Sequence, residues 1–287
     1  MSTVVTLIAA EKFQGTEIAD LEAFFKERNI LISKVQEIND HVADFFTDDF
    51  LSDLAPEFST YRNTNKVDLV VQPTANRQKK LAVFDMDSTL IINECIDLMA
   101  AKAGVEKQVA AITEQAMMGN LDFTASLTKR VALLKGIPVS IYKEVIEKIT
   151  LTEGTKELCA NLKRNNVKLA VVSGGFQPIV DWIKDLLGLD YAFANDLVDD
   201  GKTLAGVTAG RIVDGSMKAQ LLREIAEKEG LTPEQAVAVG DGSNDLPMMG
   251  VAGFGIAWHA KPKVRKEAPS QLNSKSLNDV LYILGYN

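Results

Sequence analysis

The stretch Leu81-Ala-Val-Phe84-Asp85-Met86-Asp87-Ser88-Thr89-Leu90 organises the rest of the sequence around it. Its apolar, partly β-branched run ends in two carboxylates two residues apart, a pattern typical of a buried parallel strand that delivers acids to a loop. If the chain bends there, Asp85 and Asp87 can face one point, as nucleophile and proton donor, with a hard cation between them. Asp and Ser are also common in turns and helix caps, so this stretch alone leaves that plainer explanation open.

Two further apolar runs end in the same way. They are Val167–Val172, followed by Ser173-Gly174-Gly175, and Gln235–Val239, followed by Gly240-Asp241-Gly242-Ser243-Asn244-Asp245. Helical patterns alternate with these strands, and in a doubly wound parallel sheet the carboxyl ends of neighbouring strands meet at the topological switch point. The sequence therefore predicts an α/β fold in which Asp85, Ser173 and Asp241 converge at one edge of the sheet.

Between the first two of these strands, residues 94–152 are predicted to form a wholly helical insertion. Gly104, Gly119 and Gly136 end successive amphipathic runs, and Pro138 opens the next one, which indicates four short helices. An insertion that follows the acidic stretch suggests a lid, or cap, over the site.

Three charged residues have a plain explanation beside a functional one. Arg130 shares a helix face with Phe123 and Leu127, so its guanidinium either meets an anion or reaches water while its stem covers that face. Glu94, in a first helical turn, is stabilised by the helix dipole in any case. The same dipole disfavours Lys218 at the start of its helix, which argues for a compensating negative group against the alternative of a solvated lysine.

Residues 1–75 are predicted to form a separate α+β domain of order βαββαβ. The elements are a strand Val4–Ala9, a helix Thr16–Arg28, one or two strands within Leu31–Phe46, a helix Phe50–Tyr61 and a strand Val67–Val71. The polar stretch Thr74–Lys80 is the predicted boundary to a second domain, residues 80–287. His41 stands alone and is expected to be a surface or structural residue, because no cluster of titratable groups surrounds it in this part of the sequence.

The formal net charge of −8 over 287 residues, without a long basic run, argues against nucleic acid or an anionic membrane surface as the main partner. The two cysteines, Cys95 and Cys159, lack metal-ligand spacing and are expected to be reduced thiols. No segment approaches the roughly 18 apolar residues of a membrane helix, and the apolar N-terminal run has no basic lead. We therefore expect a cytoplasmic protein of two domains.

Four of these features together resemble the ordered motifs of the haloacid dehalogenase superfamily, over about residues 80–287. They are Asp85-Met-Asp-Ser-Thr, Ser173-Gly-Gly-Phe, Lys218 and Gly240-Asp-Gly-Ser-Asn-Asp245. Within that superfamily, Glu94, seven residues after Asp87, and the stretch Asp122–Val131 resemble the phosphoserine phosphatase family. Residues 1–75 are similar to the ferredoxin-like, amino-acid-binding ACT-like domains that bacterial members often carry.

The resemblance implies a Mg²⁺-dependent phosphatase that hydrolyses O-phospho-L-serine to L-serine and phosphate, the last step of serine biosynthesis. Asp85 would attack phosphorus to form an aspartyl-phosphate, and Asp87 would protonate the departing oxygen and then activate water. The Mg²⁺ ion would be held by Asp85, the backbone carbonyl of Asp87 and Asp241, with Asp245 in a supporting position.

The resemblance also implies how the substrate is held. The residues that would bind the phosphoryl group are Ser173, Gly174 through its N–H, Lys218 and Asn244. The cap residues that would contact the rest of the substrate are Glu94, Arg130, Met117 and Phe123. Of these, Glu94 would bind the ammonium group and Arg130 the carboxylate, while the other two would form an apolar wall that excludes water. The partner is thus a small molecule, and a homodimer through the N-terminal domain is the one protein partner considered.

Two alternatives stay open. The first is a phosphatase of the same mechanism that acts on another small amino-alcohol phosphate. The second is a non-enzymatic amino-acid-sensing or receiver-like module in which a partner phosphorylates Asp85. Such a module has no need of Asp87 as an acid, or of a cap that carries Glu94 and Arg130.

Overall fold

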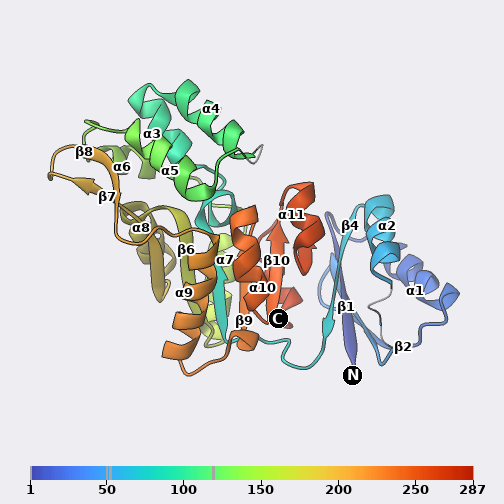
Figure 1. Cartoon of the computed structure of the whole chain (residues 1–287). Coiled ribbons are helices and arrows are strands. Elements are labelled where there is room, and N and C mark those ends of the chain that lie inside the picture. The colour runs from blue at the N-terminus through green and yellow to red at the C-terminus, as the bar shows by residue number, and fades with distance from the viewer. Residues whose placement is uncertain (1, 50, 52–53, 118–119, 287) are drawn as a thin grey trace.

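The computed structural model describes residues 2–49, 51, 54–117 and 120–286. Within these residues, a seven-stranded sheet lies at the centre with helices on both faces, and a group of cap helices lies at one end of it (Figure 1). A four-stranded sheet with its own helices, formed by the N-terminal part of the chain, lies beside the central sheet (Figure 1). The molecule therefore has a central unit, a cap and an N-terminal unit.

The strand β5 (Leu81–Phe84) lies in the middle of the central sheet. It pairs in parallel with β6 (Lys168–Phe176) on one side and with β9 (Ala236–Gly240) on the other. The outer strands are β7 (Tyr191–Asp199), β8 (Leu204–Ala209), β10 (Phe254–Trp258) and β11 (Ser270–Leu272). The order is β11-β10-β9-β5-β6-β7-β8, and each pair is parallel except β7 with β8. The prediction of an α/β fold with a mostly parallel sheet is therefore confirmed.

The strand order reverses direction next to β5. From β5 the chain runs outward through β6 and β7, then returns to β9 and continues outward on the other side through β10 and β11. A reversal of this kind leaves a crevice at the carboxyl ends of the strands, which is where α/β proteins bind their ligands.

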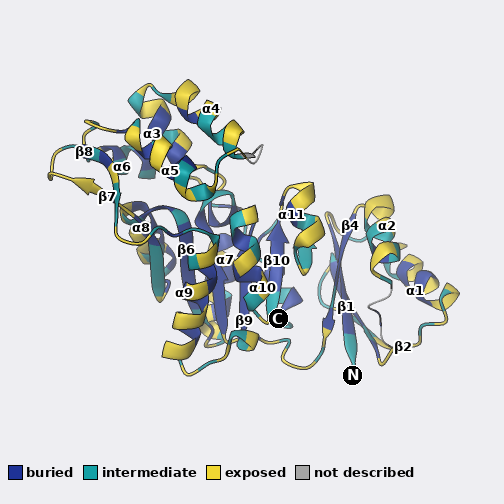
Figure 2. Ribbon diagram, viewed as in Figure 1, coloured by how far each residue is buried: buried dark blue, intermediate teal, exposed yellow. Residues whose placement is uncertain are grey.

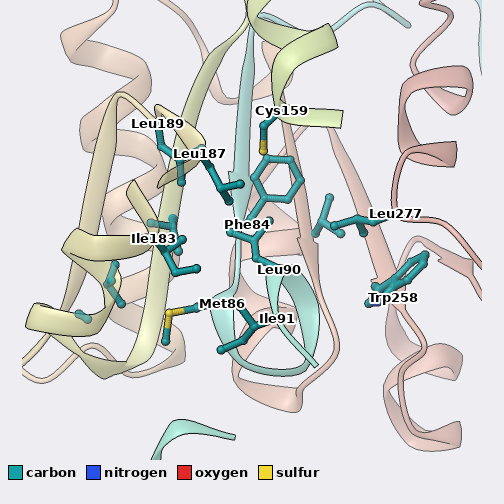
Figure 3. Close-up of a cluster of buried hydrophobic side chains, with 14 of the residues drawn as sticks. Phe84, Met86, Leu90, Ile91, Cys159, Ile183, Leu187, Leu189, Trp258 and Leu277 are labelled. Atoms are coloured by element: carbon teal, nitrogen blue, oxygen red, sulfur yellow. The ribbon is translucent and has the colours of Figure 1, made fainter. Parts of the chain in front are cut away.

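The apolar sequence of β5 is explained by its burial on both faces. The helices on one face are α9 (Gly215–Lys228) and α10 (Leu246–Val251), and those on the other face are α7 (Thr155–Arg164) and α8 (Gln177–Leu187). Leu81 and Val83 belong to the apolar cluster on the face of α9 and α10. Ala82 and Phe84 belong to the apolar cluster on the face of α7 and α8. All four are fully buried, and most residues of the neighbouring strands β6 and β9 are buried as well (Figure 2). Figure 3 shows part of the cluster on the face of α7 and α8, in which the Phe84 ring lies beside Cys159.

The cap is helical, as predicted. Its helices in the described residues are α3 (Cys95–Ala103), α4 (Glu106–Met117), α5 (Phe123–Ala132) and α6 (Ile141–Ile146). Gly104 ends α3 in the left-handed conformation, while the helix end predicted at Gly119 lies outside the described residues. The side chain of Asp122 accepts the Ala125 N–H at 2.7 Å and so fixes the start of α5, the helix that faces the central sheet.

The N-terminal unit has the predicted order βαββαβ. Its elements are β1 (Thr3–Ala9), α1 (Glu17–Glu27), β2 (Ile32–Glu37), β3 (Val42–Thr47), α2 (Ala55–Asn65) and β4 (Val67–Pro73). The strands form an antiparallel sheet in the order β2-β3-β1-β4. The helix α2 begins at Ala55 and not near Phe50, which lies outside the described residues. Pro56 explains the shift, because proline is favoured in the first turn of a helix and breaks a helix further inside.

Both faces of the N-terminal sheet are covered. On one face, residues of α1 and α2 such as Phe25 and Phe58 form an apolar cluster with the strands. On the other face, Ile8, Val42 and Val70 join the apolar core of the central unit, which includes the last helix, α12 (Asp279–Ile283). The N-terminal unit therefore has an apolar cluster of its own and also packs against the central unit through apolar residues.

The polar stretch predicted as a boundary, Thr74–Lys80, is anchored at its centre. The Arg77 guanidinium donates to the Asp44 carboxylate at 2.7 and 2.9 Å, and to the carbonyl oxygens of Tyr282 at 2.8 Å and Ile283 at 2.9 Å. A bidentate arginine–carboxylate pair of this kind is geometrically specific. It ties the N-terminal sheet to α12 across more than 200 residues of sequence.

His41 makes a second link between the two units. Its Nδ1 lies 3.1 Å from Asp40, and its Nε2 lies 3.1 Å from Asp279 at the start of α12. His41 is thus a structural residue, as expected, but it does not stand alone. The pKa of His41 is raised, because the two carboxylates outweigh the effect of partial burial.

The thiols of Cys95 and Cys159 are buried and unpaired, as expected. Among residues 2–49, 51, 54–117 and 120–286, no helix combines the length and the apolar character needed to cross a membrane.

Candidate active site

Three strand ends meet in one cavity, as the sequence predicts. Phe84 of β5 pairs with Val171 of β6 and with Val239 of β9, so Asp85, Ser173 and Asp241 lie at nearly the same level of the sheet. The strand β6 does not end at Val172 as predicted but continues to Phe176, with an irregularity in its pairing between Val172 and Phe176. Asp85, Ser173 and Asp241 all line a cavity of about 170 Å³ at this edge. The turn and helix-cap explanation of the acidic stretch does not account for this convergence.

The chain bends directly after β5. Residues Met86–Leu90 form a single irregular turn, in which Asp87 is extended and Ser88 has a φ of 54°. A left-handed conformation is uncommon for a residue with a side chain, and it is typical of functional turns. The bend brings both carboxylates, Asp85 and Asp87, to the cavity wall. The predicted bend between strand and helix is therefore present.

Lys218 lies at the centre of the charges. Its Nζ is 2.7 Å from Oδ1 of Asp85 and 2.7 Å from Oδ1 of Asp245, and its side chain is fully buried. The alternative of a solvated first-turn lysine is wrong. Burial alone would lower the pKa of Lys218, but the two carboxylates outweigh burial and raise it. Lys218 is therefore a buried cation held between two acids.

Asp245 is held from the other side by the loop after β9. Its Oδ2 accepts the Gly242 N–H at 2.9 Å. A Cβ atom at Gly240 would lie 2.4 Å from the Asp245 carboxyl group, so only glycine allows this close approach. Both oxygens of Asp245 are thus engaged, which suits a residue that orients Lys218.

The acids outnumber the cation among the described groups of the site. Asp85, Asp241 and Asp245 each offer an oxygen, and these oxygens lie within 4.8 Å of one another. Burial, followed by the charge of Asp245, raises the pKa of Asp85, and the same causes raise the pKa of Asp241 to about 7. Lys218 neutralises only part of this charge. Crowded, buried carboxylates are the ligands that a hard divalent cation prefers, so the residues fit a metal site.

Asp87 lies beside this cluster with one oxygen engaged. Its Oδ1 accepts the Cys95 N–H at 3.3 Å, while its Oδ2 lies close to Gly175, 3.2 Å from the position of a Cβ atom there. Burial, followed by the charge of Glu94, raises the pKa of Asp87 to about 7. A carboxyl group in this environment can exist with a proton near neutral pH.

The irregular segment Ser173–Gly175 of β6 is shaped by a residue that the sequence did not indicate. The Ser173 hydroxyl accepts the Gly175 N–H at 2.9 Å. Asn195 of β7 donates from Nδ2 to the carbonyl oxygens of Gly174 at 2.9 Å and Gly175 at 3.2 Å, and its Oδ1 accepts the Val213 N–H at 2.8 Å. Asn195 is fully buried. The one available signal was an amide side chain in a strand of mixed apolar and polar residues, which is too common to identify a partner 20 residues away.

The cap brings Glu94, Phe123 and Arg130 to the same cavity. The Ser88 hydroxyl donates to Oε1 of Glu94 at 2.6 Å. The Phe123 ring packs closely against Gly174 in the irregular segment of β6, since a Cβ atom at Gly174 would lie 2.7 Å from the Phe123 Cζ. The cap is therefore in contact with the site.

Arg130 faces the cavity without a direct counter-ion. Its Nε donates to the Ser126 carbonyl at 3.4 Å, and no carboxylate in the described part of the chain lies within ion-pair distance. Burial lowers the pKa of Arg130, and this effect is opposed by the charges of Asp97 and Glu94. A half-buried guanidinium in this position is available to an anion.

The remaining predicted residues divide into two groups. Asn244 lines the cavity, whereas the side chain of Met117 lies outside the described residues. The lining residues that had no predicted role are Ile96, Leu127, Gly175, Phe176 and Gly242. Leu127 was on the helix face predicted from Phe123 and Arg130, so the helical period could have found it.

Comparisons with known proteins agree with this geometry. A family model described as haloacid dehalogenase-like hydrolase matches residues 79–253. The phosphoserine phosphatase of Saccharomyces cerevisiae is 54% identical over 226 residues, which cover 77% of this chain and 73% of the yeast protein.

Two solved structures are similar as well. The crystal structure of a haloacid dehalogenase family hydrolase from Salmonella enterica has a TM-score of 0.88 and 29% identity, over 99% of this chain and 98% of that one. A structure described as a phospho-aspartyl intermediate analogue of phosphoserine phosphatase has a TM-score of 0.67 and 47% identity, over 71% of this chain and 98% of that one. The chain therefore belongs to the haloacid dehalogenase-like hydrolase family, among relatives that are phosphoserine phosphatases.

Proposed function

We propose that this chain is a Mg²⁺-dependent phosphatase that hydrolyses O-phospho-L-serine to L-serine and phosphate, the last step of serine biosynthesis. One observation carries the proposal: a single cavity of about 170 Å³ joins the carboxylates of Asp85 and Asp87 to Glu94 and Arg130 of the cap. The first pair suits phosphoryl transfer, and the second pair suits the two charged groups of an amino acid. The names of the similar proteins support the same substrate.

The chemistry follows from the free oxygens of the two acids. Oδ1 of Asp85 is engaged by Lys218 and by the Met86 N–H, which leaves Oδ2 to attack phosphorus. As the Asp85–phosphorus bond forms, the bond from phosphorus to the serine oxygen breaks, and Asp87 gives that oxygen a proton. Asp87 then takes a proton from a water molecule whose oxygen attacks phosphorus, which releases phosphate and restores Asp85.

A carboxylate and a phosphate repel each other, so the attack needs positive charge. When bound, Mg²⁺ supplies charge that neutralises the phosphoryl oxygens. Asp85, Asp241 and the backbone carbonyl of Asp87 would hold it, with Asp245 in support. Lys218 adds a fixed charge on the same side, and its burial keeps that charge unscreened.

The phosphoryl oxygens also need hydrogen-bond donors. Ser173, the N–H of Gly174, Lys218 and Asn244 are the donors that we assign to this role. Asn195 keeps the irregular segment of β6 at Gly174 in shape by donating to its carbonyl oxygen at 2.9 Å. Donors held in place before the substrate binds stabilise the transition state without reorganisation.

Substrate choice is assigned to the cap. Arg130 can bind a carboxylate through two parallel hydrogen bonds, and Glu94 can accept hydrogen bonds from an ammonium group. Phe123 closes the cavity against Gly174 and excludes water. Phosphoethanolamine lacks the carboxylate and should be a poor substrate, which separates this proposal from the amino-alcohol alternative.

The test is a phosphate-release assay with Mg²⁺ and with a chelator. Phosphoserine should be hydrolysed with Mg²⁺, phosphothreonine and phosphoethanolamine much more slowly, and all three should be stable with the chelator. Equal rates for phosphoserine and phosphoethanolamine would contradict the assigned specificity. A protein that accepts phosphate from a partner but never releases it would indicate the receiver-like module.

We also propose that residues 1–75 and 80–287 are separate domains, the second carrying the cap at about 94–152. The βαββαβ order and antiparallel sheet of the N-terminal unit support an ACT-like domain. Its strand β2 is an edge strand with exposed residues, which suits a homodimer contact. Two unpaired thiols suit the cytoplasm.

A further inference from the structure

A second, larger cavity lies between the N-terminal and central units. It has a volume of about 730 Å³ and shares no lining residue with the active-site cavity. Its walls come from α2 and β4 on one side, and from α11 (Pro262–Glu267) and β11 on the other. We call it the basic cleft and define it by Phe58, Arg62, Val71, Arg265 and Lys266.

The two walls of the basic cleft are held together. The Asp68 carboxylate of β4 accepts the backbone N–H of Asn273 at 2.6 Å and its Nδ2 at 3.0 Å. Asn273 follows β11, so this contact joins the edge strands of the two sheets. The cleft is therefore a built feature of the interface between the units.

The described lining of the cleft is positively charged in a chain of net charge −8. Arg62, Arg265 and Lys266 line it, and no Asp or Glu is among its described lining residues. Within the described part of the chain, none of the three cations forms an ion pair. An adjoining cavity of about 300 Å³ also contacts both arginines. The two guanidinium groups therefore face the same two cavities, and the one carboxylate among the described residues that line them, Asp68, is hydrogen-bonded to Asn273.

Arg62 carries an unsatisfied donor. Its Nη1 donates to the Leu69 carbonyl at 3.3 Å, but its Nε is buried and has no hydrogen-bond partner. Asp68 is the carboxylate that acts on it electrostatically, yet the oxygens of Asp68 are committed to Asn273. A buried N–H without a partner destabilises a protein unless water or a ligand satisfies it. An anion in the cleft would offer the Arg62 guanidinium an acceptor.

The cleft also has apolar walls. Phe58 and Val71 lie on the side of the N-terminal unit, and Ala268 and Pro269 lie on the side of the central unit. Pockets for small molecules combine apolar walls of this kind with a few polar groups that fix the orientation. We propose that the basic cleft binds a small organic acid, with its carboxylate or phosphoryl group at Arg62 and Arg265 and its apolar part against Phe58 and Val71.

The experiment uses ligand-observed NMR with the full-length protein and three probes of similar shape: benzoate, phenylphosphonate and neutral benzamide. Phenylphosphonate has a carbon–phosphorus bond, so it is not a substrate for hydrolysis. We expect at least one of the anions to bind about tenfold more tightly than benzamide. Preference for benzoate would identify a carboxylate ligand, and preference for phenylphosphonate a phosphoryl ligand. Equal binding of all three probes would overturn the proposal.

Variants locate the binding. Arg62→Gln and Arg265→Gln should each weaken the anion about tenfold, while the matched control Arg164→Gln, at an exposed position on α7, should not. Lys266→Gln, also exposed, provides a further test if Arg62→Gln fails to fold. Binding that survives the cleft variants, or that is lost in Arg130→Gln, would show that the anion occupies another site and would refute the proposal. None of these outcomes depends on phosphatase activity.

Discussion

The Ser88 hydroxyl donates a 2.6 Å hydrogen bond to the Glu94 carboxylate. Ser88 is in a left-handed conformation, with φ of 54°, at the bend that directly follows Asp87, the second of the two acids proposed as catalytic. One turn therefore directs Asp85 and Asp87 to the cavity and also orients the cap residue assigned to the substrate ammonium group. Chemistry and specificity are linked through the backbone of this turn.

The first prediction concerns this link. Ser88→Gly keeps the backbone conformation accessible but removes the hydroxyl, so Glu94 loses its orientation. We expect KM for phosphoserine to rise about tenfold with little change in kcat. Hydrolysis of p-nitrophenyl phosphate, which has no ammonium group, is the control reaction. An equal change for both substrates would mean that Ser88 acts on the acids and not on Glu94.

The second prediction concerns the nucleophile. Asp85→Asn should lower turnover by about a thousandfold or more, because an amide cannot form the acyl-phosphate. The fold should persist, since Lys218 keeps its contact with Asp245. Rapid quenching of the wild-type protein with labelled substrate, followed by digestion, should place the label on the peptide that contains Phe84-Asp85. Label on any other peptide would exclude the mechanism.

The third prediction concerns Arg130. Arg130→Ala should lower kcat/KM for phosphoserine about a hundredfold, because the substrate carboxylate loses a half-buried, bidentate partner. For p-nitrophenyl phosphate, which lacks a carboxylate, the change should be slight. Lys129→Ala, at the exposed neighbouring position, is the matched control and should leave both reactions unchanged. Equal losses on both substrates would remove Arg130 from the specificity role.

The fourth prediction concerns stability. Lys218→Met keeps most of the buried volume but leaves Asp85 and Asp245 without their cation. We expect the free energy of unfolding to fall by about 3 kcal/mol, because removing one partner of a buried ion pair leaves the other charge buried and uncompensated. Denaturant titration measures it, with the exposed Lys156→Met as control. An unchanged midpoint would mean that the acids protonate at little cost.

The fifth prediction is a pH dependence at the link between the units. The pKa of His41 is raised above 6.5 in the folded state by Asp40 and Asp279, despite partial burial. Its charged form is therefore favoured by folding, so its contribution is present below pH 6.5 and is lost as the pH rises through the folded-state pKa. The stability difference between wild type and His41→Gln should shrink as the pH is raised towards 8. A difference that grows with pH would have the wrong sign.

Much of the central fold could be predicted because its signals are local. An apolar strand that ends in acids, or in Ser173-Gly174-Gly175, is visible within ten residues, and parallel strands place such ends at one edge. The cap helices follow from the 3.6-residue period and from glycines at their ends. The predicted start of α2 near Phe50 is wrong, because Pro56 is favoured in the first turn of a helix and places the start at Ala55.

The sequence by itself determined the strand ends that carry Asp85, Ser173 and Asp241, since the alternation of buried strands and helices leaves few ways to arrange them. Only the tertiary structure decided that Lys218 is buried between two acids, that Asn195 shapes the irregular segment of β6 at Gly174, and that Arg77 and His41 join the N-terminal sheet to α12. These contacts join residues from 21 to more than 200 positions apart. A single side chain gives no local sign of such a partner, because the partner is chosen by packing and burial, and both exist only once the chain has folded.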